Sequence, residues 1–219
     1  MSDTALQDAE GLVRTIADTV LENEKYFSDL DAVVGDGDFG YSLARGFGKL
    51  VEEWDSLEYD DVSSLLKRTA IVLSSRIGGT SGPIWGTAFL RAATTLKDTA
   101  SPGSGDVVAA LRAAIDGIKQ RGNADLGDKT LLDALIPATD RLEQELGNGA
   151  TATDAVKAAA ATARESAEAT KTMLAKRGRA SYAGERSQDS VDAGAMAVAV
   201  LFERVSTAWS PTSSAGGVS

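Results

Sequence analysis

Residues 151–176 have the sequence TATDAVKAAAATARESAEATKTMLAK. Alanine has the highest helix propensity of all residues. Its small side chain also permits neighbouring helices to approach closely. We therefore expect one long helix over residues 151–176, packed closely against other helices.

Seven further segments have apolar residues at the spacing of an amphipathic helix. They cover residues 6–27, 43–54, 65–73, 84–96, 107–118, 131–146 and 195–209. Pro83 suits a first helical turn, whereas Pro137 lies inside its segment and predicts a kink. Only residues 32–34 suggest a short extended segment. Eight helices with short connections predict an all-α bundle in one domain over residues 1–209, followed by a Ser/Gly-rich flexible tail over residues 210–219.

The composition excludes several kinds of chemistry. The chain of 219 residues has no cysteine and no histidine, which excludes thiol nucleophiles, Cys/His zinc sites, imidazole catalysis and a phosphohistidine on this chain. It has 22 Lys+Arg against 32 Asp+Glu, and this net charge of −10 argues against nucleic acid as a partner. No segment is apolar enough to span a membrane, and the acidic N-terminus is unlike a signal peptide. We therefore expect a soluble, cytoplasmic protein that does not bind a membrane.

Glycines gather at alternate connections between the expected helices. The four groups lie at residues 35–40, 78–86, 122–127 and 178–184. A glycine-rich loop that leads into a helix exposes backbone N–H groups and can hold phosphate. Each loop alone is better explained by glycines that end helices. Four such loops at alternate junctions favour one shared ligand site at one end of the bundle.

Two of these loops match known phosphate-binding motifs only superficially. Residues 35–40 fit the dinucleotide pattern GxGxxG, but the expected neighbours are helices rather than the required βαβ unit. Residues 122–130 nearly fit the P-loop pattern, but Asp128 interrupts it and no strand precedes it. We reject both motifs, although glycine, Lys129 and Thr130 remain a combination that could suit phosphate.

Three acids lie within eight residues in the first loop: Asp31, Asp36 and Asp38. Around flexible glycines their carboxylates can converge on one point, where a hard cation such as Mg²⁺ would relieve their repulsion. The alternative is an acidic turn that caps the following helix. The spacing alone leaves these two interpretations equally open.

The other three loops also carry polar residues with two interpretations each. Thr80 and Ser81 offer hydroxyls at a helix start, where they could bind a ligand or only cap the helix. Asp128 or Thr130 could cap the next helix. Leu131 could pack on a planar ring, although core packing is commoner for such a residue. Arg179, in a glycine-flanked loop, could clamp phosphate or form salt bridges in a solvated loop.

Together the four segments resemble the nucleotide-binding L subunit, or L domain, of the dihydroxyacetone kinases. The matching motifs are DAVVGDGDFG at 31–40, GGTSGPIWGTAFLRAA at 78–93, RGNADLGDKTLLDALIPA at 121–138 and GRASYAGERS…DAGA at 178–195. The resemblance covers nearly the whole chain apart from the tail. It implies a barrel of eight antiparallel amphipathic helices that holds ATP or tightly bound ADP at one end through two Mg²⁺ ions.

The resemblance also assigns residues to this site. The magnesium ligands would be Asp31, Asp36 and Asp38. The nucleotide-contacting positions would be Gly40, Tyr41, Ser42, Thr80, Ser81, Gly122, Leu131, Arg179, Asp192, Ala193 and Gly194. Arg179 would also be catalytic, because it would stabilise charge on the transferring phosphoryl group. Two positions depart from the family pattern: Phe39 replaces a frequent histidine, and Ala193 replaces a proline.

The implied activity is that of half an enzyme. The family's ketose is held by a histidine on a separate K-type subunit or domain, so this histidine-free chain should act as a kinase only with that partner. The ketose would be dihydroxyacetone or a relative such as erythrulose. The phosphoryl donor would be ATP, slightly favoured by the departures, or a phosphotransferase-system protein that rephosphorylates bound ADP. The alternative function is a non-catalytic, Mg-nucleotide-binding regulatory module. The sequence leaves the ketose, the donor and the oligomeric state open.

Overall fold

The computed structural model describes residues 2–208, which form helices and connecting turns. The α-helices are α1 (Ser2–Glu22), α2 (Glu24–Asp31), α3 (Phe39–Glu52), α4 (Val62–Arg76), α5 (Ser81–Thr95), α6 (Ser104–Gly122), α7 (Leu132–Gly147), α8 (Ala152–Ala169) and α9 (Ala193–Ala208). Three 3₁₀ helices accompany them: η1 (Trp54–Ser56), η2 (Thr170–Thr172) and η3 (Arg179–Ser187). Residues 2–208 contain no strand, which confirms the expected all-α class. The predicted tail, residues 210–219, lies outside the described residues.

Contacts between successive helices join eight of them into a closed ring. From α1 the ring runs through α3, α4, α5, α6, α7, α8 and α9, each packed against the next, and α9 packs against α1. The short α2 lies outside this order and packs against α3 and α9. The expected bundle of eight helices is therefore present, with α2 as an additional short helix.

The first predicted helix, residues 6–27, is divided at Asn23. The backbone of Asn23 leaves the helical range, with φ −109° and ψ 12°. Its side-chain Nδ2 donates to the Thr19 carbonyl oxygen at 2.8 Å, a local bond that competes with helix continuation. The break separates α1 from α2 and turns the chain towards α3. Residues 32–34, expected to be extended, form a turn instead, because α2 ends at Asp31 and the chain reverses there.

The alanine-rich helix α8 ends at Ala169 rather than at Lys176. The hydroxyl of Thr170 donates to the Ala167 carbonyl oxygen at 2.6 Å and accepts the Asp192 N–H at 2.8 Å. These bonds end the helix and tie the following segment to the start of α9. Pro137, which predicted a kink, lies inside the continuous helix α7.

Close packing in the core explains why alanine is so frequent in α8. Ala155, Ala159, Ala163 and Ala167 have no exposed surface, and their spacing of four places them on one helix face. They pack in one cluster with apolar side chains of α6, α7 and α9. A second cluster contains apolar side chains of α1, α2, α3, α4, α5 and α9, so that α9 contributes to both clusters. Among the described helices, none combines the length and the apolar character that crossing a membrane requires.

Candidate functional site

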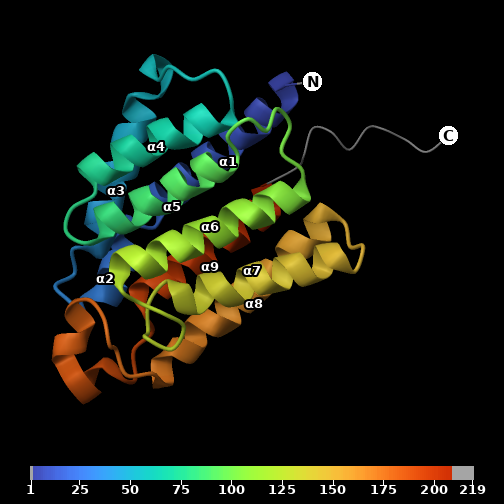
Figure 1. Cartoon of the computed structure of the whole chain (residues 1–219). Coiled ribbons are helices and arrows are strands. Elements are labelled where there is room, and N and C mark those ends of the chain that lie inside the picture. Colours follow the sequence, from blue (N-terminus) through green and yellow to red (C-terminus); the bar gives the residue numbers. More distant parts are fainter. Residues whose placement is uncertain (1, 209–219) are drawn as a thin grey trace.

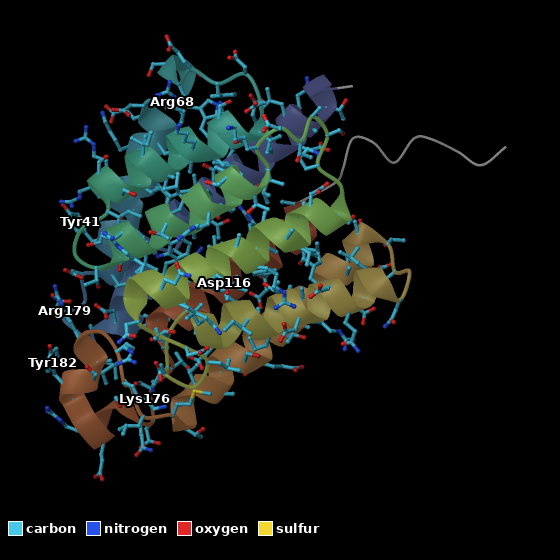
Figure 2. All side chains as sticks on the ribbon, viewed as in Figure 1. Tyr41, Arg68, Asp116, Lys176, Arg179 and Tyr182 are labelled. Carbon is cyan, nitrogen blue, oxygen red and sulfur yellow. The ribbon has the colours of Figure 1, made fainter. Side chains whose placement is uncertain are left out.

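Four connections lie together at one end of the ring. They join α2 to α3, α4 to α5, α6 to α7, and α8 to α9, which are alternate junctions. Because successive helices run in opposite directions, alternate junctions lie at the same end (Figure 1). Figure 2 shows Tyr41, Arg179 and Tyr182 along this end, with Lys176 close by. The structure therefore gathers the four glycine-containing loops as the sequence predicted.

The three acids of the first loop converge. Asp31, Asp36 and Asp38 each offer a carboxylate oxygen, and these oxygens lie within 4.8 Å of one another. Gly35 permits this arrangement, because a Cβ added there would lie 2.3 Å from Asp31 Oδ1. Asp38 precedes α3 but makes no capping hydrogen bond with its side chain. The geometry thus favours a shared ligand over the alternative of an acidic helix cap.

Arg179 reaches this acidic cluster from the connection between α8 and α9. Its Nη1 forms an ion pair with Asp36 Oδ2, and its Nη2 lies 3.6 Å from Asp38 Oδ2. The three side chains are 44% to 56% exposed, so water screens the pair and it contributes little to folding stability. The arrangement places a guanidinium group, which suits phosphate, directly beside the carboxylates.

The start of α3 supplies Gly40, Tyr41 and Ser42. A Cβ on Gly40 would lie 2.0 Å from the Glu24 carbonyl oxygen, so this glycine is required where α3 packs on α2. The Tyr41 N–H donates to Ser28 Oγ at 3.2 Å, while the Tyr41 side chain is 58% exposed. Ser42 is buried. Packing therefore explains Gly40, whatever further part it plays in ligand binding.

The start of α5 lies beside α3. A Cβ on Gly78 would lie 3.3 Å from Ser42 Oγ and 3.2 Å from Arg45 Nη2, which brings this loop next to the first one. Thr80 is exposed and makes no capping bond with its side chain, and Ser81 begins the helix. The hydroxyl of Thr80 is thus not used as a helix cap.

The connection between α6 and α7 is held by buried acids. Asp133 is 2% exposed; its Oδ1 accepts the Gly127 N–H at 2.6 Å, and its Oδ2 accepts the Thr130 N–H at 2.7 Å. Thr130 Oγ1 accepts the Leu132 N–H at 3.2 Å, so the threonine does contribute to the helix start, as one alternative predicted. Asp128 instead accepts the Asp125 N–H with its side chain.

The expectation that Lys129 could suit phosphate is not supported by its environment. Lys129 is 2% exposed, and its Nζ donates to the carbonyl oxygens of Met173, Ser187 and Ser190. An ammonium group has three N–H donors, and all three are used within the protein. Lys129 therefore joins two connections rather than facing a ligand.

The start of α9 lies against the start of α7. A Cβ on Gly194 would lie 3.4 Å from Leu131 Cβ, so two predicted nucleotide-contacting positions adjoin. Leu131 also packs against the core, as its commoner interpretation predicted. Gly122, the last residue of α6, lies close to Ile84 of α5, and Ala193 is the first residue of α9.

Asp192 immediately precedes α9 and caps it. Its Oδ1 accepts the Ala195 N–H at 2.7 Å. Removal from water raises the pKa of this carboxyl to about 7; the charge of Asp133 acts in the same direction, whereas Lys129 and the backbone N–H groups of Ala195 and Gly194 oppose it. Asp192 is thus a helix cap that holds its proton to a higher pH than an ordinary carboxyl does.

The structural parts played by Asp133 and Lys129 were not predicted from the sequence. Thr130 and Asp133 fit the Ser/Thr-x-x-Asp/Glu signature of a helix start, and this signal could have identified Asp133. The three acceptors of Lys129 lie more than forty positions further along the chain, so no local pattern could have identified them.

The donor set at the acidic cluster fits Mg²⁺. Mg²⁺ prefers carboxylate oxygens and usually keeps several waters, and Asp31, Asp36 and Asp38 provide converging oxygens at a solvent-accessible surface. No histidine or cysteine is present in the chain to favour a softer metal.

Comparison with known proteins identifies the family. The model of the DAK2 domain matches residues 33–207. The chain is 37% identical to the "PEP-dependent dihydroxyacetone kinase, ADP-binding subunit DhaL" of Escherichia coli (strain K12), over 84% of this chain and 88% of that protein. It is 35% identical to the D-erythrulose kinase of Mycolicibacterium smegmatis, over 87% of this chain and 33% of that protein.

Solved structures agree with this assignment. The dihydroxyacetone kinase of C. freundii in complex with AMP-PNP and Mg²⁺ is similar with a TM-score of 0.72 and 27% identity. The similarity covers 90% of this chain, which spans 33% of the length of that kinase. The resemblance inferred from the four motifs is therefore confirmed, and the chain belongs to the DAK2-domain family of dihydroxyacetone kinase subunits and domains.

Proposed function

We propose that this chain is the Mg-nucleotide-binding subunit of a ketose kinase, which transfers a phosphoryl group to a small ketone sugar held on a separate K-type subunit. The observation that carries the proposal is the meeting of Asp31, Asp36 and Asp38 with Arg179 at the end where four loops gather. Such a site combines metal-binding carboxylates with a phosphate-binding guanidinium group.

Phosphoryl transfer requires mainly positioning and neutralisation of charge. Asp31, Asp36 and Asp38 would hold Mg²⁺, with two ions expected from the family resemblance; bound there, the metal would neutralise the nucleotide phosphates. Arg179 would bind the transferring group and stabilise its charge. Backbone N–H groups at the starts of α3 and α5 would donate to phosphate oxygens.

The remaining predicted positions would complete the nucleotide site. Thr80 offers a free hydroxyl at the start of α5. Leu131 and Gly194 adjoin and would contact the base or ribose, while Asp192 orients the first turn of α9. A histidine would hold the ketose, and since this chain has none, a K-type partner would supply it.

The phosphoryl donor is either ATP or a phosphoprotein. The departures at Phe39 and Ala193 slightly favour ATP as a free substrate. Relatives that match over most of their own length are named PEP- or PTS-dependent, which favours bound ADP recharged by a phosphoprotein. Turnover with a K-type subunit, ketose and ATP separates these sources. Many turnovers indicate ATP, whereas a single turnover indicates a phosphoprotein donor.

Calorimetric titration with Mg²⁺ and ADP or ATP tests the nucleotide site. We expect the Asp36→Asn/Asp38→Asn double variant to lose Mg-dependent affinity by at least about tenfold, since each carboxylate is a hard ligand. The control is Asp29→Asn, a neighbouring acid on α2 that pairs with Lys25 outside the cluster. Wild-type affinity in the double variant would refute the metal assignment.

Mg-nucleotide binding without phosphoryl transfer would support the alternative function, a non-catalytic regulatory module. If the chain binds Mg-nucleotide tightly but yields no phosphorylated ketose with any K-type subunit, a regulatory module is the better description.

A further inference from the structure

Lys129 joins the two ends of the loop that carries Arg179. We call these ends, at Met173 and at residues 187–190, the neck of the loop. Its Nζ donates to the carbonyl oxygens of Met173 at 3.2 Å and Ser190 at 2.7 Å, and also to that of Ser187. Met173 lies at one end of the loop, and Ser187 and Ser190 lie at the other. One ammonium group therefore joins both ends of residues 173–190.

The loop is buried at this neck and exposed at its tip. Ala175, Ser187 and Ser190 are buried, whereas residues 176–179 and 184–186 are exposed, and Tyr182 is 90% exposed. The tip has no buried apolar side chain of its own to fix it. Its position relative to the acidic cluster therefore depends on how firmly the neck is held.

Asp128, the residue before Lys129, also binds the loop that carries Arg179. The Lys176 N–H donates to the Asp128 carbonyl oxygen at 3.1 Å. The Asp128 carboxylate lies 3.3 Å from Lys176 Nζ and 3.2 Å from Arg177 Nε. The segment just before Arg179 is thus attached to the same short stretch of chain.

Burying the Lys129 side chain at the neck is energetically unfavourable in two respects. Its backbone adopts φ 61°, which is uncommon for a residue with a side chain. Desolvation lowers its pKa, partly opposed by the charges of Asp192 and Asp189. An apolar residue would avoid the desolvation, but the carbonyl oxygens of Met173 and Ser190 would lose the Lys129 donor, and that of Ser187 would keep only the Ser190 hydroxyl.

We propose that Lys129 is a positioning residue for phosphoryl transfer, which fixes the neck of residues 173–190 and thereby holds Arg179 beside Asp36 and Asp38. The inference rests on the proposed function, in which Arg179 acts on the transferring group. Lys129 itself touches no ligand, since its three donors are bound within the chain.

Hydrogen exchange tests the positioning without any activity measurement. In Lys129→Met, which keeps the length of the side chain, peptides from residues 173–190 should exchange about tenfold faster or more, while peptides from α4 and α5 keep their protection. Unchanged exchange in residues 173–190 would overturn the proposal. If Lys129→Met does not fold, Asp128→Asn weakens the same neck and should show the same pattern at smaller amplitude.

Kinetics with a K-type subunit, ketose and phosphoryl donor test the consequence. A displacement of about 1 Å in a catalytic group can cost about 100-fold in rate, so we expect kcat of Lys129→Met to fall 10- to 100-fold. Its Mg-nucleotide affinity should fall by a smaller factor than kcat, because the three aspartates that would hold Mg²⁺ are untouched. Leu142→Ala in the core of α7 controls for general destabilisation and should leave kcat unchanged.

A double-mutant comparison separates positioning from a general structural effect. In an Arg179→Ala background, Lys129→Met should change kcat by less than about twofold, because the group that it positions is gone. An equal fall in both backgrounds would overturn the role of Lys129 and leave the proposed function intact. If Arg179→Ala alone leaves kcat unchanged, the catalytic role of Arg179 fails, and the positioning role fails with it.

Discussion

The carboxyl group of Asp192 should make the protein less stable as the pH rises. Removal from water raises its pKa from the ordinary value of 3.8 to about 7. Between these two values the folded protein binds a proton more tightly than the unfolded chain does. The free energy of unfolding therefore falls as the pH rises through this window.

The size of this effect follows from the two pKa values. A difference of about 3, at about 1.4 kcal/mol for each pH unit, gives a loss of about 4 kcal/mol from low pH to pH 8. About 2 to 3 kcal/mol of that loss falls between pH 5 and pH 8. Asp192→Asn stays neutral at every pH and keeps a side-chain oxygen that can accept the Ala195 N–H, so it removes the charge and retains the cap.

Urea unfolding, followed by the fluorescence of the buried Trp54 and Trp85, measures the free energy of unfolding at each pH. The stability of Asp192→Asn relative to the wild type should increase by about 2 to 3 kcal/mol between pH 5 and pH 8. Asp189→Asn is the matched control, because it removes an exposed carboxylate near Lys129. Parallel curves for Asp192→Asn and the wild type would refute the reasoning.

Three further predictions concern packing and burial. Gly40→Ala should lower the free energy of unfolding by about 1 to 3 kcal/mol, because its Cβ would lie 2.0 Å from a backbone oxygen, whereas Gly11→Ala, with nothing within 4 Å, should be neutral or stabilising. Ala163→Val should also lower the free energy of unfolding by about 1 to 3 kcal/mol, measured by urea unfolding, since Ala163 has no exposed surface and two added methyl groups would have to fit into the packed core. Burial, helped by the hydrogen bond to Glu10, raises the pKa of Tyr59 to about 12, so ultraviolet titration should show a late-ionising phenol that Tyr59→Phe removes.

Much of the fold could be predicted because helical periodicity is local. The face formed by Ala155, Ala159 and Ala163 is visible in the sequence, and it is the face that the core buries. The break at Asn23 could not be found in this way, because the apolar spacing continues across it. The break shows only in the backbone angles of Asn23, whose side chain also donates to the Thr19 carbonyl oxygen.

The site was predictable for a different reason and to a smaller extent. Asp36 and Asp38 lie so close in sequence that their convergence needs only one glycine turn. Arg179 lies more than 140 positions further along the chain, and only the ring brings it to Asp36. Lys129 matched a phosphate-binding pattern by residue type, but its environment assigned it to backbone carbonyls.

The aspartates at this end of the molecule fall into two groups that their environments distinguish. Asp31, Asp36 and Asp38 are accessible and direct their oxygens towards one another. By contrast, the buried Asp133 accepts two backbone N–H groups, and Asp192 accepts the Ala195 N–H.

A metal ligand must be an available, ionised carboxylate, and Asp192 is less suited than the first group, because its cap bond uses one oxygen and burial raises its pKa. Asp192 suits a contribution to nucleotide binding through the orientation of α9 rather than through Mg²⁺. It follows that substitutions in the first group should change the metal dependence of binding. Substitutions in the second group should instead alter stability and the placement of the loops.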